Sequence, residues 1–242
     1  MPDLTPFARG YALALLVGLP ALAARTGLRE GHAEDVARAR YAVYLSAALS
    51  LLLFAGGTFA VAAWQGLPPA SLGWTVPGAA SAFGWGGATA AAGLVFVWIV
   101  TRAGRWLGLR ESALALAILP RSQGEREAFV LLALVAAVGE EYIYRGFLLH
   151  VLAEWTGSPW TAAALAAVSF GLSHGYQRAV GIARSTLLGM ALSVPVIWTR
   201  SLFPAIVAHL WLNAAIGLGG WRRLYGAGGA TPGTDGNERP KG

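Results

Sequence analysis

The chain carries two adjacent glutamates and an arginine in Gly139-Glu140-Glu141-Tyr142-Ile143-Tyr144-Arg145-Gly146, inside an otherwise apolar segment from about 128 to 150. On insertion scales, each such charge at the centre of a membrane helix costs roughly 2.5–3.5 kcal/mol. A membrane protein rarely keeps such charges unless they are paired and used. This stretch therefore predicts a buried polar site within a helix.

Helical spacing separates the two glutamates. Glu141 and Arg145 are four residues apart, which brings their side chains together as an ion pair. Glu140 lies about 100° round the helix from Glu141 and faces elsewhere. We therefore expect Arg145 to hold Glu141 and to leave Glu140 available for chemistry.

The composition of the chain predicts an integral membrane protein. Of its 242 residues 56% are hydrophobic and only 12% are charged, and the mean hydropathy is +0.55. A soluble domain carries about 25% charged residues. There are no cysteines, which excludes disulfides and thiolate metal sites. The net charge of +6 comes mainly from arginine and indicates orientation and lipid contact, not binding to nucleic acid.

The predicted fold is all-α, a polytopic membrane helix bundle of about seven transmembrane helices. The expected spanning segments are 7–24, 41–64, 79–100, 128–150, 160–174, 179–199 and 202–218. The first is expected to be retained as a helix and not cleaved as a signal peptide. With seven spans, most Lys and Arg residues fall in loops on one side of the bilayer. The positive-inside rule then predicts an outside N-terminus and a cytoplasmic C-terminus.

Three regions follow from this division. Residues 1–127 hold N-terminal helices and basic loops, 128–218 hold the catalytic core, and 219–242 form a Gly-rich tail expected to be disordered. The apolar run 111–119 is too short to span and is expected to lie on the membrane surface as an interfacial helix.

Further polar residues lie within the later apolar segments. His174 ends the fifth segment, with Phe170 four residues before it, and His209 lies in the seventh, with Asn213 four residues after it. Residues four apart share one helix face. Together with the glutamates they could satisfy one another in one cavity, in the cytoplasmic half of the membrane.

Hydrolysis needs the groups that this set supplies. A desolvated Glu140 suits a general base, and His174 would position the water. His209 and Asn213 would donate to the oxyanion, while Glu141 and Arg145 hold the helix. In a metal variant Glu140, His174 and His209 would ligate zinc, with water in the open position.

At these residues the chain resembles the CPBP family of intramembrane proteases, which includes the type II CAAX prenyl endopeptidase. Three family motifs stand intact and in order, each on a predicted helix: Glu140-Glu141-Tyr142-Ile143-Tyr144-Arg145, Phe170-Gly171-Leu172-Ser173-His174 and His209-Leu210-Trp211-Leu212-Asn213. The resemblance covers about 128–218.

The resemblance implies a glutamate-dependent endopeptidase in which Glu140 and His174 activate water and His209 and Asn213 hold the oxyanion. We favour a site without a tightly bound metal. The implied partners are a peptide or membrane-protein substrate and the lipid bilayer, and the implied location is the bacterial cytoplasmic membrane. The prenyl substrate of eukaryotic members is not carried over.

Two rival functions compete with the enzyme. One is a non-catalytic scaffold or bacteriocin-immunity protein that keeps the protease fold, and the other is a proton-coupled transporter. A scaffold has no need of Glu140 once Glu141 pairs with Arg145. Arg178 and Arg184 are expected to be positive-inside residues. The alternative is that they attract a substrate carboxylate or an acidic segment.

Overall fold

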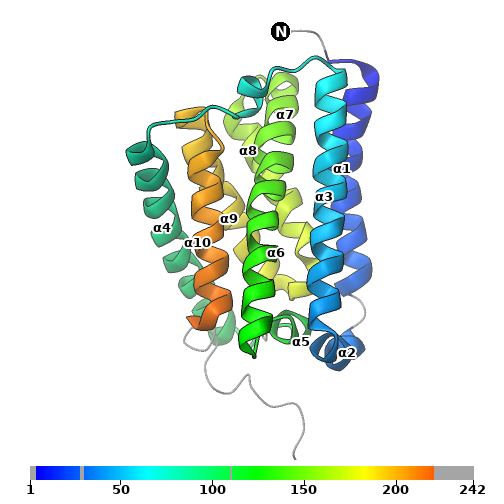
Figure 1. The fold of residues 1–242 in the computed structure, drawn as a ribbon, viewed down its shortest axis with the longest axis vertical. Helices are drawn as coiled ribbons and strands as arrows, with labels where there is room; N and C mark the ends of the chain where they lie inside the picture. The colour runs from blue at the N-terminus through cyan, green and yellow to red at the C-terminus, as the bar shows by residue number, and fades with distance from the viewer. Residues whose placement is uncertain (1–3, 28–29, 110, 221–242) are drawn as a thin grey trace, which may run out of the picture.

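The described part of the chain is a bundle of helices (Figure 1). The computed structural model describes residues 4–27, 30–109 and 111–220, and within these ranges it contains no strand. The helices are α1 (Pro6–Gly27), α2 (Ala33–Arg38), α3 (Arg40–Trp64), α4 (Ala79–Trp106), α5 (Ala113–Ala117), α6 (Gln123–Glu141), α7 (Leu149–Thr156), α8 (Pro159–Ser173), α9 (Arg178–Thr199) and α10 (Phe203–Ala215). This confirms the predicted all-α fold. Most of the tail predicted to be disordered, from 221 onward, lies outside the described residues.

The helices pack so that the motif-bearing ones meet in the middle. Helix α6 packs against α3 and α10, α8 packs against α1, α7 and α9, and α4 covers α9 and α10. Figure 1 shows α6 crossing the middle of the bundle, with α4 at one side and α1 and α3 at the other. The three motifs are therefore on helices that surround one interior.

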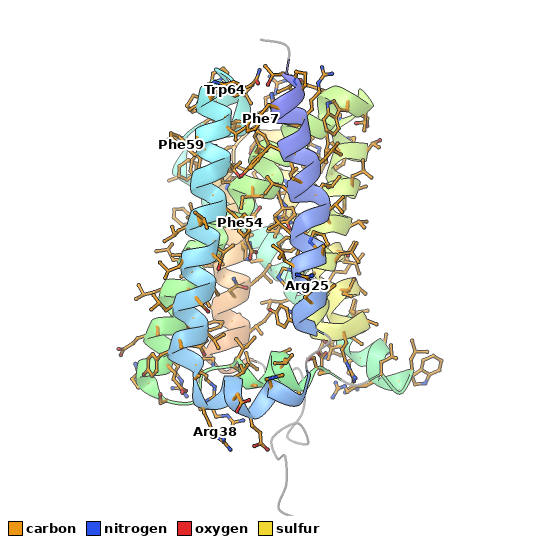
Figure 2. All side chains as sticks on the ribbon, turned by 90° about the vertical axis from the view of Figure 1, so that its right-hand side faces the viewer. Phe7, Arg25, Arg38, Phe54, Phe59 and Trp64 are labelled. Atoms are coloured by element: carbon orange, nitrogen blue, oxygen red, sulfur yellow. The ribbon has the colours of Figure 1, made fainter. Side chains whose placement is uncertain are left out.

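Length and composition identify membrane-spanning helices. Four stretches, within α1, α3 and α4 and over Gly175–Thr199, are long and apolar enough to cross a bilayer, and α8 and α10 are shorter apolar helices. Large apolar side chains point outward, with Leu53 74% exposed and Phe59 62% exposed. Figure 2 shows Phe59 directed away from the bundle. An outer surface of this kind suits lipid, so the chain is a helical membrane bundle; the number of seven spans stays a prediction.

The arginine-rich segments gather at one end of the bundle. Helices α2 and α5 lie at the end opposite the N-terminus (Figure 1), and in Figure 2 Arg25 and Arg38 lie toward that end, away from Phe7 and Trp64. We call this end, which holds α2 and α5, the basic end. Its assignment to the cytoplasm stays a prediction of the positive-inside rule.

The helix with the paired glutamates is longer than predicted and is not uniform. It begins at Gln123 instead of 128, because Ser122 and Glu125 form a capping box around its first turn. After Glu141 it continues as a π-helical segment, Tyr142–Leu148, and then as α7 to Thr156 instead of ending at 150. A π-helical turn in an α-helix is rare and frequently marks a functional site.

The run 111–119, predicted to be an interfacial helix, is helical only over α5, and its location at the membrane surface stays a prediction. It folds back across the basic end, where its short helix α5 packs against α2, and its Leu114 and Ala117 are buried. Arg40 Nε donates to the carbonyl of Ala117 at 2.7 Å, and the hydroxyl of Tyr44 donates to the carbonyl of Ile118. These hydrogen bonds to backbone carbonyls hold the segment 111–119 against the basic end of the bundle.

Close packing of α8 on α9 depends on Gly171 in the second motif. A Cβ at this position would lie 2.8 Å from the carbonyl oxygen of Ile182 and 2.9 Å from the backbone nitrogen of Thr186. We expect Gly171→Ala to lower the free energy of unfolding by about 1–3 kcal/mol, because the two backbones must separate. Thermal unfolding in detergent measures this. The matched control is Gly56→Ala, where an added Cβ meets nothing within 4 Å; equal stability of the two variants would contradict the expectation.

Candidate active site

Glu141 is a buried carboxylate that binds its partners through one oxygen, Oε1. Its side chain is 0% exposed, and its Oε1 accepts hydrogen bonds from Arg145 Nη1 at 2.9 Å and from His209 Nδ1 at 2.7 Å. The predicted ion pair of Glu141 and Arg145 is confirmed. Arg145 also donates from Nη2 to the carbonyl of Gly189 at 3.0 Å, which ties the π-helical segment after α6 to α9. Glu141 and Arg145 thus hold three helices in register.

Glu140 lies on a different side of the helix and lines a cavity. Its side chain is 18% exposed, compared with 0% for Glu141. Glu140 Oε2 lies 3.7 Å from Nε2 of His209. The two carboxylates therefore have different environments, as their positions around the helix predicted.

His209 links the two glutamates. Because a carboxylate can only accept, the 2.7 Å contact means that Nδ1–H of His209 donates to Glu141. The other ring nitrogen, Nε2, is then the one that lies near Glu140. The hydrogen bond from Nδ1–H to Glu141 fixes the orientation of the imidazole.

His174 is oriented by its own helix. Its Nδ1 lies 2.8 Å from the carbonyl oxygen of Phe170, so Nδ1–H is the donor and Nε2 of the neutral ring carries the lone pair. The residue caps α8 at the point where Ser173 ends it. The four-residue spacing in the second motif thus positions the histidine through a backbone carbonyl.

Phe170 packs at the centre of the site. Its ring centroid lies 4.6 Å from the guanidinium carbon of Arg145, 4.6 Å from the His174 ring and 6.2 Å from the His209 ring. A guanidinium over an aromatic face gains a cation–π interaction. Phe170 therefore packs against the side chains of Arg145 and His174 and brings the first two motifs into contact.

The cavity beside these residues has a volume of about 610 Å³. Glu140, His174, His209 and Asn213 all line it, so the structure brings the four side chains predicted to take part in chemistry to one space. Most of the remaining lining is apolar and comes from several helices: Leu22 and Leu19 of α1, Leu51 and Phe54 of α3, Leu132 of α6 and Leu188 of α9. Cavities of this size and character hold small molecules or a few residues of a peptide.

A zinc ion held by Glu140, His174 and His209 would need three ligand atoms about 2.0–2.2 Å from one point. In the part of the chain that the structure describes, no three His, Asp or Glu side chains are grouped so that they could hold a metal ion. The side chains as placed do not fit a metal centre.

The comparison with protein families gives one match. Residues 124–215 match the model described as type II CAAX prenyl endopeptidase Rce1-like. This segment is Rce1-like. The match confirms the resemblance predicted from the three motifs, all of which lie within the Rce1-like segment, although that segment is less than half of the chain. The family is one of CAAX-type intramembrane proteases, which is the class of enzyme expected from the motifs. No curated protein and no solved structure matches the chain.

Several residues around the Rce1-like site were not predicted. The hydroxyls of Tyr144 and Ser173 lie 2.8 Å apart and connect the π-helical segment to α8. The Tyr176 ring lies near the His174 ring, with 6.1 Å between ring centroids, and the Tyr176 hydroxyl accepts a hydrogen bond from Gln177 Nε2 at 3.0 Å. Their closeness in sequence to the motifs could have indicated these residues, because each lies within a motif or no more than three residues from one.

Proposed function

We propose that the chain is an intramembrane endopeptidase in which Glu140 activates water. The observation that supports this most strongly is that the two glutamates have different environments. Glu141 is fully buried and bound by Arg145 and His209, whereas Glu140 lines the cavity with Nε2 of His209 nearby. A structural ion pair needs only one carboxylate, so the second is available for proton transfer.

The reaction begins with a water molecule between Glu140 and His174. Glu140 takes one proton from the water, Nε2 of His174 accepts a hydrogen bond from the other hydrogen, and the water oxygen bonds to the carbonyl carbon of the peptide. The carbonyl oxygen becomes an oxyanion, which accepts hydrogen bonds from the side-chain amide of Asn213 and from Nε2–H of protonated His209. Glu141 at Nδ1 then balances the positive charge of His209.

Collapse of this intermediate breaks the C–N bond. The proton held by Glu140 passes to the leaving amine, which restores the carboxylate and releases a carboxylic acid and an amine. The half-buried environment of the cavity supports each hydrogen bond, because bulk water competes less for donors there.

The proposed substrates are membrane-associated or hydrophobic peptides. The apolar lining and the volume of about 610 Å³ suit a few residues of extended peptide. The matched family is named for endopeptidases of CAAX prenyl substrates, but the proposal for this chain is limited to the peptide. We further propose the bacterial cytoplasmic membrane as its location, with the basic end in the cytoplasm.

Peptide cleavage by the purified protein in liposomes tests the function. Because no step of the proposed mechanism uses a metal, we expect a chelator to leave the cleavage rate unchanged. Rates are measured with wild type and Glu140→Gln, each with and without chelator. Loss of wild-type activity with chelator and its return with zinc would make Glu140, His174 and His209 metal ligands. Equal cleavage by wild type and Glu140→Gln would remove the proposed mechanism.

A further inference from the structure

A second charged site lines the same cavity. Arg184 of α9 is only 6% exposed, and its Nη1 lies 3.0 Å from Oε1 of Glu111. The same guanidinium donates to Oε1 of Gln177 at 2.8 Å and reaches the hydroxyl of Thr101 at 3.5 Å. Arg184 is thus a buried arginine that already binds a carboxylate, and its predicted role as a positive-inside residue stays a prediction.

The anion in this site comes from a separate segment of the chain. Glu111 precedes α5 in the run 111–119, and its side chain is 12% exposed. Both Glu111 and Arg184 line the cavity, as do Leu116 and Leu119 from the same run. The protein's own carboxylate therefore enters the cavity from the basic end and binds the arginine there.

A chain of side chains links Arg184 to the candidate catalytic histidine. Arg184 binds Gln177, Gln177 donates to the hydroxyl of Tyr176, and the Tyr176 ring lies 6.1 Å from the His174 ring. A group bound at Arg184 would consequently share the cavity with a peptide bond at Glu140 and His174.

We propose that Arg184 binds a carboxylate group of the peptide substrate, and that Glu111 takes this position when no substrate is bound. This inference rests on the proposed endopeptidase function. The carboxylate is either the free C-terminus of the peptide or an acidic side chain, since both present the same two oxygens to a guanidinium.

A substrate carboxylate can bind the buried Arg184 if it replaces the carboxylate of Glu111. Removing the partner of a buried charge is strongly unfavourable, because the remaining charge is left uncompensated. A substrate carboxylate that replaces Glu111 keeps the charge of Arg184 compensated throughout. A substrate without a carboxylate would have to leave the pair of Glu111 and Arg184 intact and would lose this interaction.

The test compares three peptides of one sequence: a C-terminal acid, a C-terminal amide, and an amide with one glutamate added near its C-terminus. Wild type in liposomes is expected to cleave a carboxylate-bearing peptide with a kcat/KM on the order of 10- to 100-fold above the plain amide. Preference for the acid alone identifies the C-terminus, and preference for the added glutamate identifies a side chain. Glu111→Gln is expected to keep the preference and to lower KM, because the competing carboxylate is gone.

Arg184→Gln is expected to reduce the ratio of the rates to about one. A ratio for one preparation does not depend on how much of the protein is folded, so partial misfolding cannot mimic this result. Arg184→Lys keeps the charge but not the fork of donors, and we expect an intermediate ratio. The matched control is Arg178→Gln, which removes the same charge from an exposed position of α9 outside the cavity lining and should leave the ratio unchanged.

Failure of this inference is distinguishable from failure of the proposed function. Cleavage of all three peptides at equal rates, dependent on Glu140, would overturn the carboxylate site and keep the endopeptidase. An unchanged ratio in Arg184→Gln would overturn it as well. Binding of the labelled peptides to Glu140→Gln protein gives a readout without cleavage, and equal affinity for acid, plain amide and glutamate-bearing amide would overturn the site even if no peptide were cleaved.

Discussion

Glu140→Gln is expected to lower the rate of peptide cleavage about 10²–10⁴-fold while the protein remains folded. The amide has nearly the shape of the carboxylate but cannot take a proton from water, and general-base catalysis contributes an effect of this size. Glu140 makes no ion pair with an arginine among the described contacts, so the substitution leaves the structural network of Glu141 in place. Steady-state rates in liposomes, together with thermal unfolding in detergent, measure both parts of the prediction.

The matched control for this prediction is Glu154→Gln. Glu154 is also a helical glutamate beside a histidine, 3.6 Å from His150, but it does not line the cavity. Its substitution should leave the rate within about twofold of wild type, as surface changes usually have small effects. If Glu140→Gln matches wild type both in cleavage and in a cellular phenotype, the enzyme must be abandoned in favour of the non-catalytic scaffold.

The second large effect concerns stability. Arg145→Met is expected to lower the free energy of unfolding by about 3–5 kcal/mol, because it leaves the carboxylate of Glu141 buried without its ionic partner. The same change removes the hydrogen bond to the carbonyl of Gly189 and the cation–π contact with Phe170. Equilibrium unfolding of the purified protein in mixed detergent micelles measures the loss.

A double-mutant cycle separates the ion pair from the other contacts of Arg145. Glu141→Gln with Arg145→Met should cost clearly less than the sum of the two single substitutions, since no uncompensated charge remains. Additivity within about 0.5 kcal/mol would show that Glu141 and Arg145 do not stabilise the fold as a pair. An enzyme and a non-catalytic scaffold would both need this ion pair, so the double-mutant cycle does not distinguish the two functions. The cleavage rate of Glu140→Gln distinguishes them.

The proton-coupled transporter is a weaker rival. Chains of glutamate and histidine relay protons in transporters, and Glu140, His209 and Glu141 form a contiguous set. The third residue is held by Arg145, however, and the Rce1-like match over 124–215 belongs to a protease family. Proton uptake into liposomes without peptide would be the observation in its favour.

Much of the fold could be predicted because the length and hydropathy of each helix can be read from its own segment of sequence. The apolar segments became helices α1, α3, α4, α6 and α8 to α10, since length and hydropathy are local properties. The predicted start of the fourth segment at 128 was wrong because the capping box of Ser122 and Glu125 extends the helix over polar residues. The π-helical segment Tyr142–Leu148 was missed, because no periodicity in the sequence distinguishes it from an α-helix.

The sequence by itself determined the membrane character of the protein, the pairing of Glu141 with Arg145 and the shared faces of Phe170 with His174 and of His209 with Asn213. These are properties of single helices, in which residues four apart are neighbours whatever the rest of the chain does. Only the tertiary structure decided that His209 binds Glu141 across 68 positions and that Glu111 reaches Arg184 across 73. Contacts of this kind depend on how helices pack against one another, and the pattern within one helix does not say which neighbour its polar face will meet.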